Sequence, residues 1–185
     1  MLMNENLLFV RINGNIDENE SNDIPFKKVE DLYFTYHLLL NSTLGSNMDY
    51  TTIDKQLMYE HFPSLERLHE FAMKNTQKIF PAHIVEILGP IKMYAVTNVR
   101  AIFGATALFY PHVFNFLADK FKTDFYCIPS SIHEFLIIPK SEDTDSFIIK
   151  SIIHDVNYSI VNDQDRLSDH LYEYNVEARK FSTVK

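Results

Sequence analysis

Residues 128–139, IPSSIHEFLIIP, place two hydroxyls, an imidazole and a carboxylate within five positions. Ser130, Ser131, His133 and Glu134 are the residue types of a hydrolytic site in which a serine attacks a carbonyl carbon. In such a site the acid orients the histidine ring, and the ring accepts the proton of the serine hydroxyl. The first question is therefore whether these side chains can meet at one reacting atom.

The geometry of an extended chain argues against such a meeting. Successive side chains of a strand point to opposite faces, so a strand over 131–138 places Ser131 and His133 on one face and Ser130 and Glu134 on the other. The chain also has only four glycines and no Gly-x-Ser-x-Gly turn, which leaves few sharp turns for an oxyanion loop. We expect the serines to satisfy free backbone groups at a turn or strand entrance.

A hydrolase that uses Ser131, His133 and Glu134 is the alternative function. It requires a cleft in which these residues meet a second polar cluster, for which Asn98 and Asp169 are candidates. Glu134 has apolar neighbours on its face, and a carboxylate in such surroundings needs a partner. We expect that partner to come from another segment of the chain.

No metal or cofactor site is expected from the remaining motifs. The eight histidines show no His-Glu-x-x-His spacing, and DQDRLSD (163–169) lacks the central glycine and final glutamate of a calcium loop. Cys127, the single cysteine, lies in the apolar run FYCI and is expected to be a buried, unreactive side chain.

Charge and compartment restrict the partners that we expect. The formal net charge is −8 and there is no basic cluster, which disfavours direct binding of nucleic acid and favours a basic protein partner, such as a nucleic-acid-binding protein. The apolar tract 101–118 is interrupted by a proline, a histidine and an asparagine, so we expect no membrane span. The absence of a basic leader and the lone cysteine predict a cytoplasmic protein.

The hydrophobic pattern predicts an α+β fold with a mostly antiparallel sheet covered by helices in a single pair of layers. Strands are expected over 7–12, 29–40, 48–53 and 92–98, and 124–139 is expected to contribute two strands with a bend near Pro129. Helices are expected over 54–62, 64–80, 101–110, 111–121 and from about 145. HIVEILGP (83–90) is expected to form a short turn or helix. We predict a single domain over 1–185, in which 7–60 contains N-terminal strands and a short helix, 64–161 contains central helices and strands, and 162–185 contains a C-terminal hairpin.

Several short words of the sequence resemble, in order and spacing, an uncharacterised domain-of-unknown-function family from gut bacteria. They are AMKNT (72–76), MYAVTN (93–98), GATALFYP (104–111), DFYCIPSSIHEFLIIP (124–139), DVN (155–157) and LSDHLYEYN (167–175). Many members of that family have a Pro-Ser-Ser-x-His-Glu signature, here residues 129–134, and the similarity extends over about residues 30–181. The resemblance implies a related fold, a bacterial or phage setting and a shortened stand-alone version of the domain, and it brings no established activity.

These observations together predict a non-enzymatic protein-binding or regulatory protein. One concrete form is a phage-type inhibitor of a host nucleic-acid-targeting defence system, similar in action to an anti-CRISPR protein, that occupies a basic channel. A dimerisation module that pairs through the edge of the terminal hairpin is a further alternative, with a homodimer as its product. The side chains expected to contact a partner are Asn98, Ser130, Ser131, His133, Glu134, Asp169, Tyr172 and Tyr174.

Overall fold

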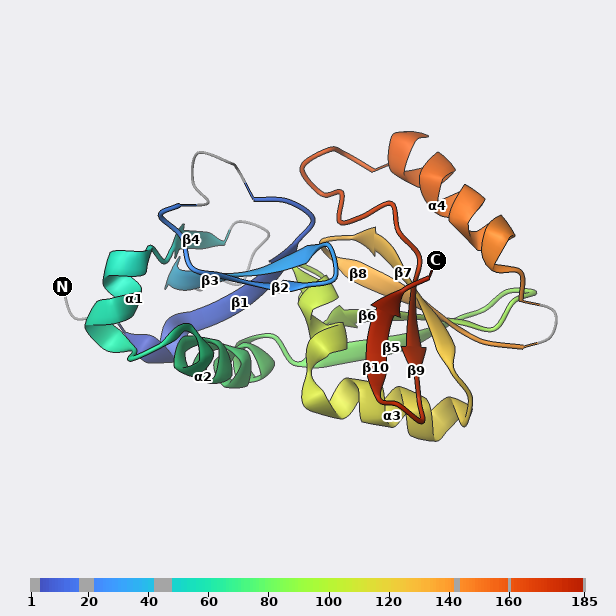
Figure 1. The fold of residues 1–185 in the computed structure, drawn as a ribbon, viewed down its shortest axis with the longest axis horizontal. Coiled ribbons are helices and arrows are strands. Elements are labelled where there is room, and N and C mark those ends of the chain that lie inside the picture. The colour runs from blue at the N-terminus through green and yellow to red at the C-terminus, as the bar shows by residue number, and fades with distance from the viewer. Residues whose placement is uncertain (1–3, 17–21, 42–47, 142–143, 160, 185) are drawn as a thin grey trace. The chain divides into compact units, whose positions relative to one another are not determined.

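The computed structural model of the protein describes residues 4–16, 22–41, 48–141, 144–159 and 161–184 (Figure 1). The chain divides into two compact units, Met1–Pro81 and Ala82–Lys185, and each contains its own antiparallel sheet. Compact units are not the same as independently folding domains, so the single domain expected from the sequence stays a prediction.

In the first unit a sheet packs against a helix. Its elements are η1 (Glu5–Leu7), β1 (Leu8–Asn13), β2 (Phe26–Val29), β3 (Leu32–Asn41), β4 (Asp49–Thr52), α1 (Lys55–His61) and α2 (Leu65–Ile79). The long strand β3 pairs with β1, β2 and β4, all antiparallel. Ser64 caps α2 by accepting a hydrogen bond from the backbone of Arg67, and α2 buries Leu68 and Ala72.

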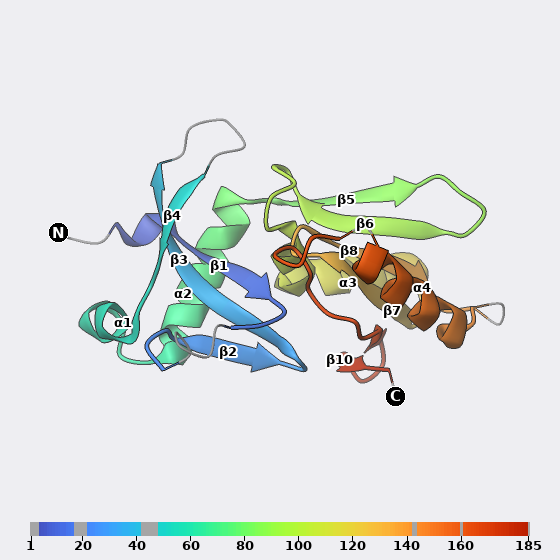
Figure 2. The same cartoon turned by 90° about the horizontal axis from the view of Figure 1, so that it is seen from above.

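The second unit is built on a six-stranded sheet. Its elements are β5 (Ala82–Ile87), β6 (Met93–Asn98), η2 (Gly104–Phe109), α3 (Pro111–Phe121), β7 (Phe125–Ser131), β8 (Glu134–Pro139), α4 (Ser146–Ser159), β9 (Tyr172–Asn175) and β10 (Lys180–Thr183). The strand order is β10-β9-β7-β8-β6-β5, so the terminal hairpin and β5 form the two edges. Figure 2 shows β5 at its edge of the sheet and α4 over β7 and β8.

The two faces of this sheet have different covers. One face packs against η2 and α3 through aromatic contacts, among them Tyr94 with Phe121 and Phe109 with Phe135. The pairing register places these buried residues on that face: Tyr94, Val96, Phe125, Cys127, Phe135, Ile137, Tyr172 and Tyr174. On the other face α4 packs against Tyr126 and Ile138 through Ile149 and Ile153.

The α+β class and the antiparallel pairing predicted from the sequence are confirmed. A single pair of layers is not, because the second sheet has helices on both faces. The expected turn or helix at 83–90 is wrong: its first part is strand β5. The apolar helix expected over 101–110 is a 3-10 helix limited to Gly104–Phe109. Within the described residues no helix is long and apolar enough to cross a membrane.

The first unit buries a titratable side chain on β3. His37 is 5% exposed, and its ring lies between the hydroxyls of Thr35, 2.8 Å from Nε2, and Thr52, 3.3 Å from Nδ1. Burial, with a smaller effect of nearby Arg11, lowers the pKa of His37 to about 3. Burial also lowers the pKa of His69, on α2, to about 4.

These depressed pKa values predict acid instability. Between pH 6.5 and about 4 the unfolded chain binds protons at these sites that the folded chain does not, so the free energy of unfolding decreases as the pH falls. In urea titrations at several pH values, His37→Gln should be less stable at pH 7 and show a shallower loss below pH 6.5. The exposed His83→Gln is the matched control and should retain the native slope. An unchanged slope in His37→Gln would contradict this account.

Candidate functional site

The polar signature lies at a tight hairpin turn rather than in one strand. β7 ends at Ser131, β8 begins at Glu134, and Ile132 and His133 form the turn between them. A register irregularity lies between Pro129 and Ser131. The expectation of one regular strand over 131–138 is therefore wrong, and the positions of the side chains follow from the turn.

Three segments hold the backbone of this turn. The Ile132 amide donates to the carbonyl of Asp165 at 2.9 Å, and the Ile132 carbonyl accepts from the Ala105 amide at 3.2 Å. The Thr97 hydroxyl donates to the carbonyl of His133 at 2.8 Å. The turn thus connects β6, the start of η2 and the loop before β9, which satisfy both backbone groups of Ile132 and the carbonyl of His133.

The ring of His133 has a partner at each nitrogen. Nδ1 accepts the amide of Phe103 at 3.2 Å, and Nε2 lies 3.5 Å from Asp165 Oδ1. Because Nδ1 accepts a hydrogen bond, the neutral ring carries its proton on Nε2, facing the carboxylate. The Phe103 ring stacks on the imidazole with an interplanar angle of 13°. In this arrangement Nδ1 is occupied and cannot serve as the base for a serine.

The serines of the signature bind locally. Ser131 Oγ accepts the backbone amide of His133 at 3.1 Å, which is the turn role predicted from the sequence. Ser130 Oγ donates to Glu134 Oε1 at 3.2 Å across the hairpin. The expectation that Glu134 finds its partner in another segment is therefore wrong. In the described structure the hydroxyls of Ser130 and Ser131 make no hydrogen bond to the His133 ring.

Asn98 stabilises the loop that leads to η2. Its Nδ2 donates to the Ile102 carbonyl at 2.8 Å, and its Oδ1 accepts the Arg100 amide at 2.9 Å. The loop needs such support because Ala101 and Phe103 have φ values of 53° and 54°, in the left-handed region that costs energy for residues with a Cβ. Asn98 is 2% exposed, so its amide serves this loop.

The remaining predicted contact residues lie apart from the turn. Tyr172 is fully buried and Tyr174 is 6% exposed, and their rings stack on Phe181 and Phe114, with centroids 4.8 and 4.4 Å apart. Both tyrosines belong to the sheet core and offer no surface to a partner, contrary to the sequence-based expectation. Asp169 is exposed in the loop before β9, and its predicted role stays a prediction.

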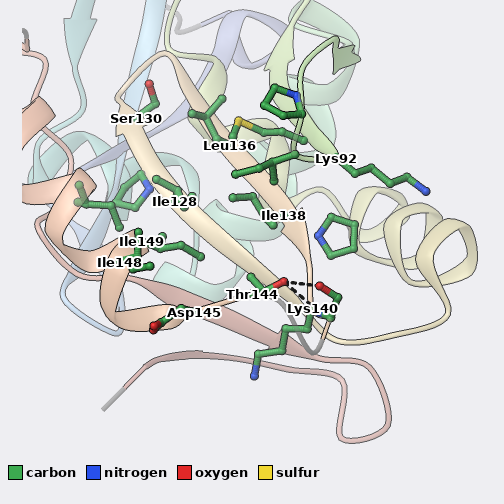
Figure 3. Close-up of a pocket in the computed structure, with 17 residues that line it drawn as sticks. Lys92, Ile128, Ser130, Leu136, Ile138, Lys140, Thr144, Asp145, Ile148 and Ile149 are labelled. Carbon is green, nitrogen blue, oxygen red and sulfur yellow. Dashed lines mark hydrogen bonds between the residues drawn. The ribbon is translucent and has the colours of Figure 1, made fainter.

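A cavity of about 530 Å³ lies beside the turn, between α4 and the sheet face opposite α3 (Figure 3). Its floor is apolar and includes Ile128 and Pro129 from β7, Ile138 from β8, and Ile149 and Ile153 from α4. Figure 3 shows Ile128, Leu136 and Ile138 side by side along this wall. The volume falls in the range of roughly 300–1,000 Å³ that is common for ligand sites. The sequence pattern does not reveal this cavity, because its walls come from β6, β7, β8, α4 and the loops that precede β6 and α4.

Polar groups at the mouth of the cavity are mostly occupied. Asp145 Oδ1 accepts the Phe147 amide at the start of α4, and Ser141 and Thr144 bind each other. Lys140 pairs with Glu173 and lies over the ring of Tyr126. The pKa of Lys140 is raised; burial opposes the rise, and the hydrogen bond and charge of Glu173 outweigh it.

Lys92 differs from these groups. It is exposed, lines the mouth, and has no hydrogen-bond or ion-pair partner among the residues that the structure describes. Figure 3 shows its side chain extending away from the apolar wall. Among the described residues, Lys92 is therefore an unpaired positive charge at the entrance to an apolar cavity.

An apolar surface continues outward from the cavity to the edge of the sheet. The register places Val85 and Ile87 of β5 opposite Ala95 and Met93, on the same face as the cavity. Val85 is 41% and Ile87 is 38% exposed. The loop after β5 adds Leu88 at 94% and Ile91 at 57% exposure. We call Val85, Ile87, Leu88 and Ile91 the open apolar surface.

Comparison with known families gives one match. Residues 86–176 match a family of unknown function (DUF5688). The matched range contains the hairpin turn, Asn98 and all the described residues that line the cavity, and the first unit lies outside it. The resemblance to a domain of unknown function is confirmed over these residues. No curated protein and no solved structure matched the chain.

Gly104 tests the packing of the turn. A Cβ at Gly104 would lie 2.2 Å from Thr97 Oγ1, 2.5 Å from the His133 carbonyl oxygen and 2.7 Å from the Asn98 amide nitrogen. We predict that Gly104→Ala lowers the free energy of unfolding by about 2–3 kcal/mol, because two of these atoms are backbone. Gly89→Ala is the matched control, since its Cβ would meet nothing within 4 Å. Equal urea midpoints for the two variants would show that the turn is not tightly packed.

Proposed function

We propose that the protein is a non-enzymatic binding protein that acts on another protein. The partner contributes an extended apolar segment that pairs with the free edge of β5 and covers the open apolar surface. Strand addition of this kind obtains affinity from main-chain hydrogen bonds, and it obtains specificity from the side chains that alternate along the added strand.

The observation that carries this proposal is the exposure of large apolar side chains on an edge strand. Edge strands usually avoid pairing by means of charges, prolines or bulges. β5 instead displays Val85 and Ile87 on one face and is followed directly by the exposed Leu88. Contiguous exposed apolar residues mark interaction sites, and no strand of the described residues pairs with the outer edge of β5.

The hydrogen bonding of the signature supports a binding role over hydrolysis. The groups that a serine hydrolase would need are engaged in holding the turn: His133 Nδ1 accepts the Phe103 amide, and Ser131 Oγ accepts the His133 amide. The carboxylate nearest the ring belongs to Asp165 rather than to Glu134. No nucleophile–base hydrogen bond of the kind that a triad requires is formed by these side chains.

Charge supports a basic partner. The chain has a formal net charge of −8, which favours encounter with a positively charged protein and opposes approach to nucleic acid itself. The most specific form of the proposal is a phage-type inhibitor that binds a nucleic-acid-targeting defence complex of the host. A second copy of this chain is the competing occupant of the β5 edge.

Substitutions on β5 test the partner surface. The doubly substituted Val85→Lys/Ile87→Lys protein should fold, because lysine is tolerated on edge strands. When it is immobilised on an affinity column, it should retain at least ten-fold less of a purified basic, RNA-guided nuclease complex than the native protein does, at low and at moderate salt. Val99→Lys is the matched control, since Val99 is 60% exposed and lies outside the surface; Glu134→Gln should also bind like the native protein.

The outcomes separate the possible occupants. Equal recovery by the native and β5-substituted proteins would overturn the proposed surface, and no recovery by either would overturn the proposed class of partner. Light scattering on the same proteins checks self-association. A native dimer that becomes a monomer on β5 substitution would identify a second copy as the occupant and contradict the proposal.

A further inference from the structure

We infer that the cavity between α4 and the sheet is a binding site for a linear aliphatic amphiphile with an anionic head, such as a medium-chain carboxylate. The cavity residues Ile128, Leu136, Ile138, Ile149 and Ile153 hold the chain, and Lys92 at the mouth pairs with the head. This site adjoins the open apolar surface, with which it shares Ile91 at the mouth, but its floor lies outside that surface and its ligand does not depend on the proposed function.

The exposure of the lining residues distinguishes a buried floor from an open mouth of the cavity. Pro129, Ile138, Ile149 and Ile153 are buried at the floor, whereas Ile91, Lys92, Asp145 and Ile148 are exposed at the mouth. A ligand that enters therefore places its interior end against aliphatic side chains only. A polar group at that depth would lose its hydration without a partner, which is costly, so the inner part of the ligand must be apolar.

The residue types in the walls favour an aliphatic chain over an aromatic ring system. The floor is formed mainly by branched aliphatic residues and a proline, and no aromatic residue is among the described residues that line the cavity. A volume of about 530 Å³ accommodates far more than a single solvent molecule, since a water molecule takes up about 30 Å³ in the liquid. Removing this apolar surface from contact with water strongly favours the binding of an apolar group.

The charges at the mouth select the sign of the head group. Asp145 is already used as the cap of α4, where the helix dipole compensates its charge. Lys140 is paired with Glu173. Lys92 is the cation at the mouth that has no partner among the described residues, and its flexible side chain can turn to a carboxylate at the surface. An anionic head is therefore matched by Lys92, whereas a cationic head would meet the like charge of Lys92.

Direct binding measurements on the whole native protein test this site. Isothermal titration with octanoate, decanoate and dodecanoate, below their micelle concentrations, should show saturable one-to-one binding. Each added CH2 should tighten binding roughly four-fold while the cavity is being filled. Dodecanoate should bind more tightly than dodecyltrimethylammonium. Absence of saturable binding, or affinity independent of chain length, would overturn the inference.

Two variants and a label locate the ligand. Leu136→Trp fills the cavity and should reduce dodecanoate affinity at least ten-fold, and Lys92→Glu should abolish the preference for the anionic head. If Leu136→Trp does not fold, NMR spectra of the native protein with methyl-labelled methionine locate the ligand instead. Dodecanoate should shift the Met93 signal, since Met93 lines the cavity, and leave Met58 and Met73 of the first unit unchanged. A shift confined to the latter two would place the ligand elsewhere.

The β5 variant distinguishes failure of this inference from failure of the proposed function. Val85 and Ile87 do not line the cavity, so Val85→Lys/Ile87→Lys should bind dodecanoate like the native protein even when it no longer recovers a partner. Dodecanoate binding that disappears in this variant would mean that the chain lies on the open apolar surface rather than in the cavity, and would contradict the assignment.

Discussion

The second unit depends on a two-residue turn that its own sequence does not favour. Ile132 and His133 lack the glycine, asparagine or aspartate that usually allows a two-residue hairpin turn. The bonds from Asp165, Thr97 and Ala105 to the turn backbone supply what local propensity does not. This turn fixes the ends of β7 and β8, which are the central strands on which α3 and α4 pack from opposite sides.

The sequence predicted the elements whose pattern is periodic. β3 is rich in aromatic and aliphatic residues, α2 has a cap and an apolar stripe, and Pro111 begins α3 at the position that proline tolerates. β5 was missed because residues 84–88 are largely apolar without alternation, a pattern that short helices and strands share. The turn at 132–133 was missed because its determinants are hydrogen bonds from distant segments, which no local pattern encodes.

The same limits apply to the site. Local geometry correctly placed Ser131 at a backbone group, and it correctly separated His133 from Glu134. It could not give Ser130 as the partner of Glu134, because the hairpin that brings the two together was not foreseen. The cavity was also beyond reach, since it depends on how α4 lies on the sheet.

The hairpin connects the structural and the binding parts of this unit. Its polar atoms form hydrogen bonds with the loop before η2 and the loop before β9. Ile128 and Pro129, on strand β7 of the hairpin, contribute to the apolar floor of the cavity. One short segment therefore forms hydrogen bonds that hold neighbouring loops and also contributes an apolar wall to the cavity. This division explains how residues of a hydrolytic type occur in a protein for which we propose a binding function.

The position of the proton on the His133 ring tests most directly whether hydrogen bonds from distant segments hold the hairpin turn. Nitrogen NMR of the imidazole near pH 7.5, together with hydrogen exchange of the Phe103 amide, reports on the bond between them. The account predicts that Nδ1 accepts the Phe103 amide and the ring proton lies on Nε2, with a Phe103 amide that exchanges slowly. A ring protonated at Nδ1, or a Phe103 amide that exchanges as fast as in an unfolded chain, would contradict the account.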